Sequence, residues 1–190
     1  MSLTKKDIIL AAICGLSVSW IAFDFLGKIG LIFVIIFPIL SIIGLCLLDL
    51  IGRKFLFVRQ LGKFALAGAF ADVFDIKIFQ LIFLFLPYSL FVKAISFIFA
   101  TFIKYFSDKY WTFSARGGSA WGGEKIHIEM IKFFAVAVLG LLINVASFYF
   151  FSKINIGATA KIWQEASIIF AALVTAIWNF CGYKFLVFKK

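Results

Sequence analysis

The chain is poor in the residues from which catalytic and metal sites are usually built. It contains three cysteines and one histidine among 190 residues, and charged residues make up only 15% of it. Cys14, Cys46 and Cys181 lie in hydrophobic runs with no paired spacing, which indicates apolar packing rather than redox chemistry or metal binding. No nucleophile–base pair and no set of metal ligands is apparent in the sequence. We therefore expect no enzymatic activity and no bound cofactor.

Hydrophobic residues are abundant instead. They make up 64% of the chain and the mean hydropathy is +1.11, far above the apolar share of a soluble domain. Six runs approach the ~20 apolar residues that cross a bilayer, and they leave no room for a soluble catalytic domain. The sequence therefore predicts an all-α, polytopic membrane bundle of six transmembrane helices, at about residues 8–26, 30–51, 64–86, 88–107, 131–152 and 161–183.

The net charge of +10 is unevenly distributed along the chain. Most of the Lys and Arg residues flank the two termini and the loops after the second and fourth runs, whereas the other loops have few. Basic residues favour the cytoplasmic side of a membrane, so we expect a multi-pass protein of the cytoplasmic (inner) membrane with both termini inside. A basic rim on that side attracts anionic lipid headgroups, by about 1 kcal/mol per residue near the surface.

Two segments of the chain, residues 63–113 and 132–188, look like two copies of one two-helix hairpin. Their starts match at an offset of 69 positions and their ends at 75, so the length difference falls between the two helices, where insertions cost least. Such a repeat suggests a transporter-like or lipid-handling protein. The matched residues are Lys63-Phe64 and Lys132-Phe133, Gly68 and Ala137, Asp75 and Asn144, and then the segments 109–113 and 184–188.

The repeats divide the chain into two predicted domains. Residues 1–58 form an N-terminal two-helix membrane hairpin, and residues 59–190 form a four-helix membrane domain that contains both copies. Because each hairpin begins and ends on the same side of the membrane, the two copies would have the same orientation, as parallel repeats do.

The repeated motifs resemble those of the GtrA-like family of small multi-pass membrane proteins, over about residues 63–190. Hairpins of that family open with a basic-Phe pair, a small residue and an Asp, and they close with a polar residue, basic or aromatic residues and Trp-x-Phe. This chain departs at Asp108, where the family often has Asn, and at Leu186, where it often has Trp. The resemblance implies a role in cell-surface polysaccharide synthesis, in which the protein flips a polyprenyl-phosphate-linked sugar across the cytoplasmic membrane.

Three charged residues lie near the middle of the third run. Asp72, Asp75 and Lys77 would each cost about 2.5–3.5 kcal/mol at the bilayer centre without a partner or water. At about 100° per residue, Asp72 and Asp75 share one face and Lys77 points elsewhere. Our hypothesis is that Asp75 lines a polar cavity, with Asn144 at the matched place, while Lys77 reaches a partner on a neighbouring helix or protomer. The alternative is that these charges only neutralise one another and fix helix register.

A second group of candidate residues lies where the predicted spans meet the cytoplasm. A lipid phosphate needs cationic donors at headgroup depth, and a sugar favours amide groups beside an aromatic ring. The lysines of the repeated motifs, with nearby tryptophans and an asparagine, meet both needs. The alternative for any single lysine is ordinary membrane anchoring. The candidate substrate-binding residues here are Lys63, Lys104, Lys109, Trp111, Lys132, Trp178, Asn179 and Lys184.

Three functions follow from these patterns and remain open at this point. The first, implied by the resemblance, is a flippase for a polyprenyl-phosphate-linked sugar. The second is a membrane anchor or regulatory subunit of a glycosyltransferase. The third is a small proton-coupled cation or drug exporter, for which an acidic residue in mid-membrane is the usual requirement. The expected partners are the lipid-linked sugar, anionic lipids and a second copy of the chain that enlarges the small bundle; we expect no nucleic acid.

Overall fold

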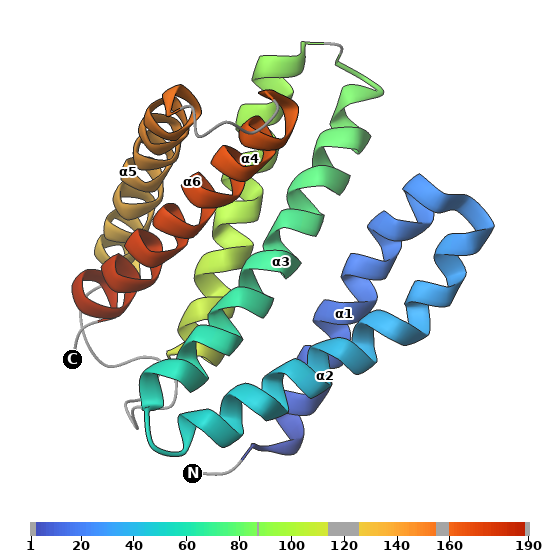
Figure 1. Ribbon diagram of the computed structural model, residues 1–190, viewed down its shortest axis with the longest axis vertical. Coiled ribbons are helices and arrows are strands. Elements are labelled where there is room, and N and C mark those ends of the chain that lie inside the picture. Colours follow the sequence, from blue (N-terminus) through green and yellow to red (C-terminus); the bar gives the residue numbers. More distant parts are fainter. Residues whose placement is uncertain (1–2, 87, 114–125, 155–159, 189–190) are drawn as a thin grey trace. The chain divides into compact units, whose positions relative to one another are not determined.

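The computed structural model describes residues 3–86, 88–113, 126–154 and 160–188, and every regular element within these ranges is helical (Figure 1). The all-α prediction is therefore confirmed for the described residues. Each of the six predicted runs corresponds to one long helix. The helices are α1 (Lys5–Leu26), α2 (Phe33–Gly52), α3 (Leu56–Phe83), α4 (Ser89–Ser107), α5 (Ile126–Lys153) and α6 (Ala160–Gly182), and a 3-10 turn, η1 (Gly27–Ile32), joins α1 to α2.

Small residues let α1 and α2 pack closely into a hairpin. A Cβ added at Gly15 would lie 2.5 Å from the Cα of Pro38, so only a glycine fits where the two backbones meet. Ser19 Oγ donates a hydrogen bond of 2.7 Å to the Phe33 carbonyl across the same contact. Gly27 caps the end of α1, and its φ of 55° lies in the region that favours glycine. The hairpin is thus built by backbone approach as much as by side-chain packing.

The first of two compact units, Met1–Trp121, contains this hairpin together with α3 and α4. α3 contacts α1, α2 and α4, so it joins the N-terminal hairpin to the first repeat. A buried ion pair strengthens the contact of α2 with α3, with Arg59 Nε 2.7 Å from Asp49 Oδ1. The start of α1, the turn between α2 and α3, and the end of α4 lie at one end of this unit (Figure 1).

The second unit, Gly122–Lys190, contains the second repeat, in which α5 packs along α6. The Phe133 ring of α5 stacks on Tyr183, which follows α6, with ring centroids 3.9 Å apart. The Trp178 indole N–H donates a hydrogen bond of 3.1 Å to the Val136 carbonyl. The predicted domain boundary near residue 58, which lies inside the first unit, stays a prediction.

In the part of the chain that the structure describes, four stretches are long and apolar enough to cross a membrane: Lys5–Asp24, Gly27–Gly52, Ile126–Phe151 and Phe170–Val187. Within the described residues, α3 and α4 do not meet the same criterion. The charges of α3 explain its failure, because Arg59, Lys63, Asp72, Asp75 and Lys77 are spread along the helix. The structure therefore supports a multi-pass membrane protein, and the arrangement with six transmembrane helices stays a prediction.

Both repeats end in the same irregular turn. α4 continues into a π-helical turn, η2 (Asp108–Thr112), and α6 continues into another, η4 (Tyr183–Val187). The Phe113 N–H donates to the Asp108 carbonyl at 2.9 Å, and the Phe188 N–H donates to the Tyr183 carbonyl at 2.8 Å. The two turns lie at the 75-position offset of the sequence motifs. Because π turns are rare and frequently occur at functional sites, the two hairpin ends are candidate functional sites.

Candidate functional site

A buried cluster at the end of the first repeat brings together two of the predicted site residues. The Asp7 carboxylate of α1 pairs with the Lys63 ammonium of α3. The same oxygen, Asp7 Oδ1, accepts a hydrogen bond of 2.9 Å from the indole N–H of Trp111 in η2. All three residues are buried. The N-terminal hairpin therefore supplies the anion that balances the first lysine of the repeat.

A capping box at the start of α1 orients this carboxylate. Asp7 Oδ2 accepts hydrogen bonds from the backbone N–H of Thr4 at 3.0 Å and from its hydroxyl at 2.9 Å. The Thr4 hydroxyl in turn accepts from the Asp7 N–H at 3.2 Å. One carboxylate oxygen thus fixes the helix terminus while the other faces Lys63 and Trp111. Sequence reasoning missed Asp7, although the Thr4-x-x-Asp7 spacing is the signal of such a cap.

Lys104 forms the second charged contact of this region. Its ammonium lies 3.1 Å from Asp108 Oδ2 and 3.3 Å from the Phe64 carbonyl, and it sits 3.8 Å above the centre of the Phe64 ring. Asp108 is completely buried, and its other oxygen accepts a hydrogen bond of 2.9 Å from the Thr112 hydroxyl. Lys104 therefore joins α3 to α4 inside the protein, whatever further role it has toward a substrate.

Lys109 is half-buried one turn beyond Lys104, in η2. Its ammonium donates a hydrogen bond of 3.0 Å to the Tyr105 hydroxyl and lies 5.3 Å from the centre of that ring. Asp7 links Lys63 to Trp111, and Lys104 contacts Phe64, the neighbour of Lys63, so these residues lie at one end of the first unit together with Lys109. The role in binding a lipid phosphate that the sequence suggests for these residues stays a prediction.

The predicted intramembrane charges make contacts on different sides of α3. The Ser96 hydroxyl of α4 donates a hydrogen bond of 2.6 Å to Asp75 Oδ1. Lys77 pairs with Asp24 of α1, and its ammonium lies 4.6 Å from the centre of the Trp20 ring. The neighbouring-helix partner expected for Lys77 is therefore Asp24, which sequence reasoning had not connected with it. Asp72 is exposed on the surface of the first unit.

The second repeat has a polar contact at the position that matches Asp75. The Asn144 amide donates a hydrogen bond of 3.1 Å to the Thr175 hydroxyl of α6. Asn179 packs its side chain over Gly140, where an added Cβ would lie 2.3 Å from Asn179 Oδ1. In each repeat, then, a polar residue of the first helix bonds a hydroxyl of the second.

The remaining candidate residues of the second repeat lie around its end. Lys132 and Trp178 are half-buried. Lys184 is buried, with 8% of its surface exposed, and its ammonium lies 5.5 Å from the ring centres of Phe180 and Phe185. Two aromatic rings therefore flank Lys184 in this copy, and carboxylates pair with Lys63 and Lys104 in the first. The predicted seam of Asp75, Lys77 and Asn144 includes residues of both units and stays a prediction.

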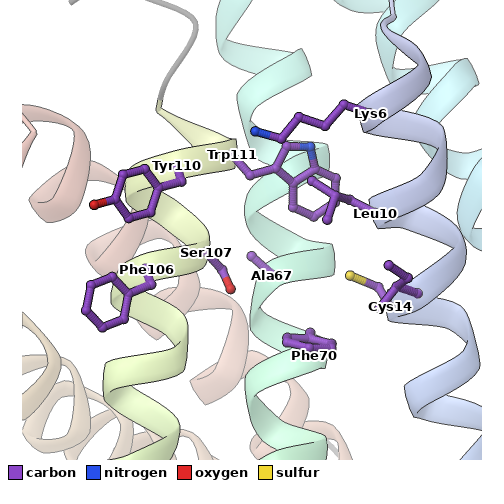
Figure 2. A pocket seen from close by; sticks show the side chains of 10 residues that line it. Lys6, Leu10, Cys14, Ala67, Phe70, Phe106, Ser107, Tyr110 and Trp111 are labelled. Atoms are coloured by element: carbon purple, nitrogen blue, oxygen red, sulfur yellow. The ribbon is translucent and has the colours of Figure 1, made fainter. Parts of the chain in front are cut away.

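A cavity of about 280 Å³ opens beside the Asp7 cluster, between α1, α3 and the end of α4 (Figure 2). Apolar side chains form most of its wall, and the Lys6 ammonium and the Trp111 indole lie at one end. Within the described residues, no group of three or more His, Cys, Asp and Glu side chains is arranged to hold a metal ion. The lining residues are Lys6, Leu10, Ile13, Cys14, Ala67, Phe70, Phe106, Ser107, Tyr110 and Trp111.

Comparison with known proteins gives one match. A family model described as "GtrA/DPMS, transmembrane domain" matches residues 63–188, which is about two thirds of the chain and includes both repeats with their π turns. Searches of curated proteins and of solved structures found no match. The helices α1 and α2, with Asp7 and Asp24, lie outside the matched region.

Proposed function

The chain belongs to the GtrA/DPMS transmembrane-domain family, which makes it a membrane protein of glycan or polysaccharide synthesis, and from this premise we propose that it flips a polyprenyl-phosphate-linked sugar across the cytoplasmic membrane. The protein acts as a carrier rather than as an enzyme. Its task is to bring a charged phosphate and a hydrophilic sugar through the apolar core of the bilayer, where each unpartnered polar group costs several kcal/mol.

The hairpin ends are the binding site for the phosphate in this proposal. Lys63, Lys104 and Lys109 lie at one end of the first unit, and Lys132 and Lys184 lie at the matched places of the second. The excess of basic residues at the termini and hairpin ends supports a cytoplasmic position for them. Cationic donors at this depth attract the lipid phosphate, while the part of the prenyl chain remote from the phosphate stays in the surrounding lipid.

The observation that carries the proposal is the pair of polar contacts that the matched residues Asp75 and Asn144 make inside the repeats. Asp75 bonds Ser96 in the first copy, and Asn144 bonds Thr175 in the second. Hydroxyl, amide and carboxylate groups are the partners that a sugar needs where water is absent. Because no ATP-binding motif is apparent in the sequence, transport is downhill or coupled to an ion, with the ionisable Asp75 as the proton carrier.

Transport by purified protein in vesicles tests the proposal. A fluorescent polyprenyl-phosphate-linked sugar is placed in both leaflets, and its accessibility to an external reagent reports flipping. We expect Asp75→Asn and Lys77→Ala to slow flipping at least tenfold, because each removes an ionisable group from the path. Full transport by both variants would contradict the path, and no transport by the wild-type protein would contradict the function. If cells that lack the protein lost glycan synthesis while flipping was unchanged, the role of a glycosyltransferase subunit would be favoured instead.

A further inference from the structure

The N-terminal hairpin, which lies outside the family match, forms one wall of the cavity in the first unit. α1 contributes Leu10, Ile13 and Cys14 to the lining, and α3 contributes Ala67 and Phe70. On the side of α4, the Phe106 and Tyr110 rings are parallel, with their centroids 6.2 Å apart. The cavity walls from α1, α3 and the end of α4 are therefore mostly apolar. Of these elements, α1 lies outside the region that the family model matches.

The volume of the cavity suits one hydrocarbon chain. Its ~280 Å³ lies near the lower end of the roughly 300–1,000 Å³ typical of small-molecule pockets. A glycerophospholipid carries two chains on one headgroup, and the second would remain outside. A single isoprenoid chain has flat units around its double bonds, and such units pack well against the ring faces of Phe106 and Tyr110. The volume and the apolar lining thus favour a single-chain lipid over a two-chain lipid.

The charges at the end of the cavity favour an anionic headgroup. Lys6 is exposed, and its ammonium lies at the end of the cavity beside the Trp111 indole (Figure 2). The nearby carboxylate of Asp7 is already occupied by Lys63, Trp111 and the cap of α1. Asp108 is completely buried and paired with Lys104. Because both carboxylates are compensated, the end of the cavity is cationic, as binding of a phosphate requires.

We propose that this cavity binds the lipid carrier itself, with the isoprene units next to the phosphate between α1, α3 and α4 and the phosphate at Lys6. The proposal rests on the proposed function for the identity of the lipid. It gives the N-terminal hairpin a role in substrate capture, since α1 supplies both the apolar wall and the cation. Asp7 has a positioning role here, because its contacts with Lys63 and Trp111 hold α1 against the first repeat.

Photo-crosslinking of the full-length protein in phosphatidylcholine vesicles tests this inference. The probe is a polyprenyl phosphate with a diazirine on an isoprene unit near the phosphate, and mass spectrometry of peptides locates the label. We expect label on α1 near Cys14 and on the segment from Phe106 to Trp111. Phosphatidylglycerol with a diazirine in one acyl chain serves as the anionic two-chain comparison, and we expect at most a tenth of the label from it in the cavity.

Three variants sharpen the experiment. Cys14→Phe fills the cavity from α1 and is expected to lower the label at least tenfold; Ala67→Leu fills it from α3 and serves if the first variant does not fold. Lys6→Gln is expected to lower the label about fivefold, as for the loss of one lysine near a lipid phosphate. Lys5→Gln is the matched control, since Lys5 is an exposed neighbour that does not line the cavity.

The outcomes separate this inference from the proposed function. Label that persists in folded Cys14→Phe and Ala67→Leu, equal effects of Lys6→Gln and Lys5→Gln, or equal label from phosphatidylglycerol would each overturn the inference. Flipping by wild-type protein without label in the cavity would overturn the inference and leave the function standing. Label in the cavity without flipping would support the binding site and overturn the function.

Discussion

At the end of the first repeat, Lys104 lies over the Phe64 ring and pairs with buried Asp108, whereas at the matched place of the second repeat Phe133 stacks directly on Tyr183. The two copies have matching sequence motifs and end in the same π turn, so the backbones of their hairpin ends are alike. In the first copy, a lysine and a carboxylate lie between the helices. In the second copy, two aromatic rings lie there.

The buried charges of the first copy explain its packing against the N-terminal hairpin. A buried lysine needs a partner, because an isolated buried charge costs several kcal/mol. Lys63 finds its partner in Asp7 of α1, and Lys77 finds its partner in Asp24 of the same helix. The charged repeat thus depends on the extra hairpin for two of its counter-charges. We infer that the hairpin and the charges of the first repeat form one functional arrangement.

Removal of Asp7 is expected to have the largest effect on this arrangement. Asp7→Ala takes away the carboxylate that pairs with Lys63, and the loss of one partner of a buried ion pair costs about 3–5 kcal/mol. The free energy of unfolding in mixed detergent micelles measures the effect. Lys5→Ala, an exposed change on the same turn, is the control and should leave stability unchanged. Equal stability of the two variants would mean that the hairpin does not depend on Asp7.

Lys104 offers the next largest effect and a direct comparison between the copies. Lys104→Met leaves Asp108 buried without its cation, and we expect a loss of about 2 kcal/mol, between the values for buried and surface ion pairs. Asn179 lies 75 positions after Lys104, at the offset of the hairpin ends. Asn179→Ala should therefore lower the free energy of unfolding by less than half as much. Lys104→Met combined with Asp108→Leu should recover part of the loss. If the double variant is no more stable than Lys104→Met in the same micelles, the pair is not coupled.

The polar contacts in mid-hairpin give the smallest expected effects. Asn144→Ala removes the bond to Thr175, and such bonds between membrane helices contribute about 0.6 kcal/mol on average. Ser96→Ala takes a donor from the Asp75 carboxylate, and we expect up to about 1.7 kcal/mol, the upper end of the measured range. Unfolding in micelles checks the order of the two losses. If Asn144→Ala cost more than Ser96→Ala, the Asp75 carboxylate would depend less on its one hydroxyl partner than Asn144 does.

Much of the fold follows from the sequence because its causes are local. Apolar length predicts six helices, and the offsets of 69 and 75 positions predict where the hairpin motifs recur. Asp7 escaped prediction because its partners are remote, at 56 residues for Lys63 and 104 for Trp111. The same holds for Asp24 and Lys77, at 53 residues. The sequence shows a charge within an apolar run, and such a charge needs a partner in the membrane. Only the packing of α1 on α3 identifies that partner.

The same physical reason limits the prediction of the candidate site. The sequence indicates Lys63 by its place in the repeat, with Trp111 in the closing motif, and Lys104 by its place inside the fourth predicted helix; the structure brings the three to one end of the first unit. Asp108 lies only four residues after Lys104, whereas the other partners, Asp7 and the Phe64 carbonyl, are set by contacts between helices. The cavity beside them arises between α1, α3 and α4 and therefore has no counterpart in any single stretch of sequence.

Flipping of a polyprenyl-phosphate-linked sugar by Asp75→Asn and by Asn144→Asp, in one vesicle assay with the wild-type protein, tests the central claim most directly. The account assigns the ionisable group to the first copy, beside the charged end and the N-terminal hairpin. It predicts that Asp75→Asn slows flipping at least tenfold and that Asn144→Asp added to it restores little. Wild-type rates in Asp75→Asn, or full rescue by the acid in the second copy, would contradict it.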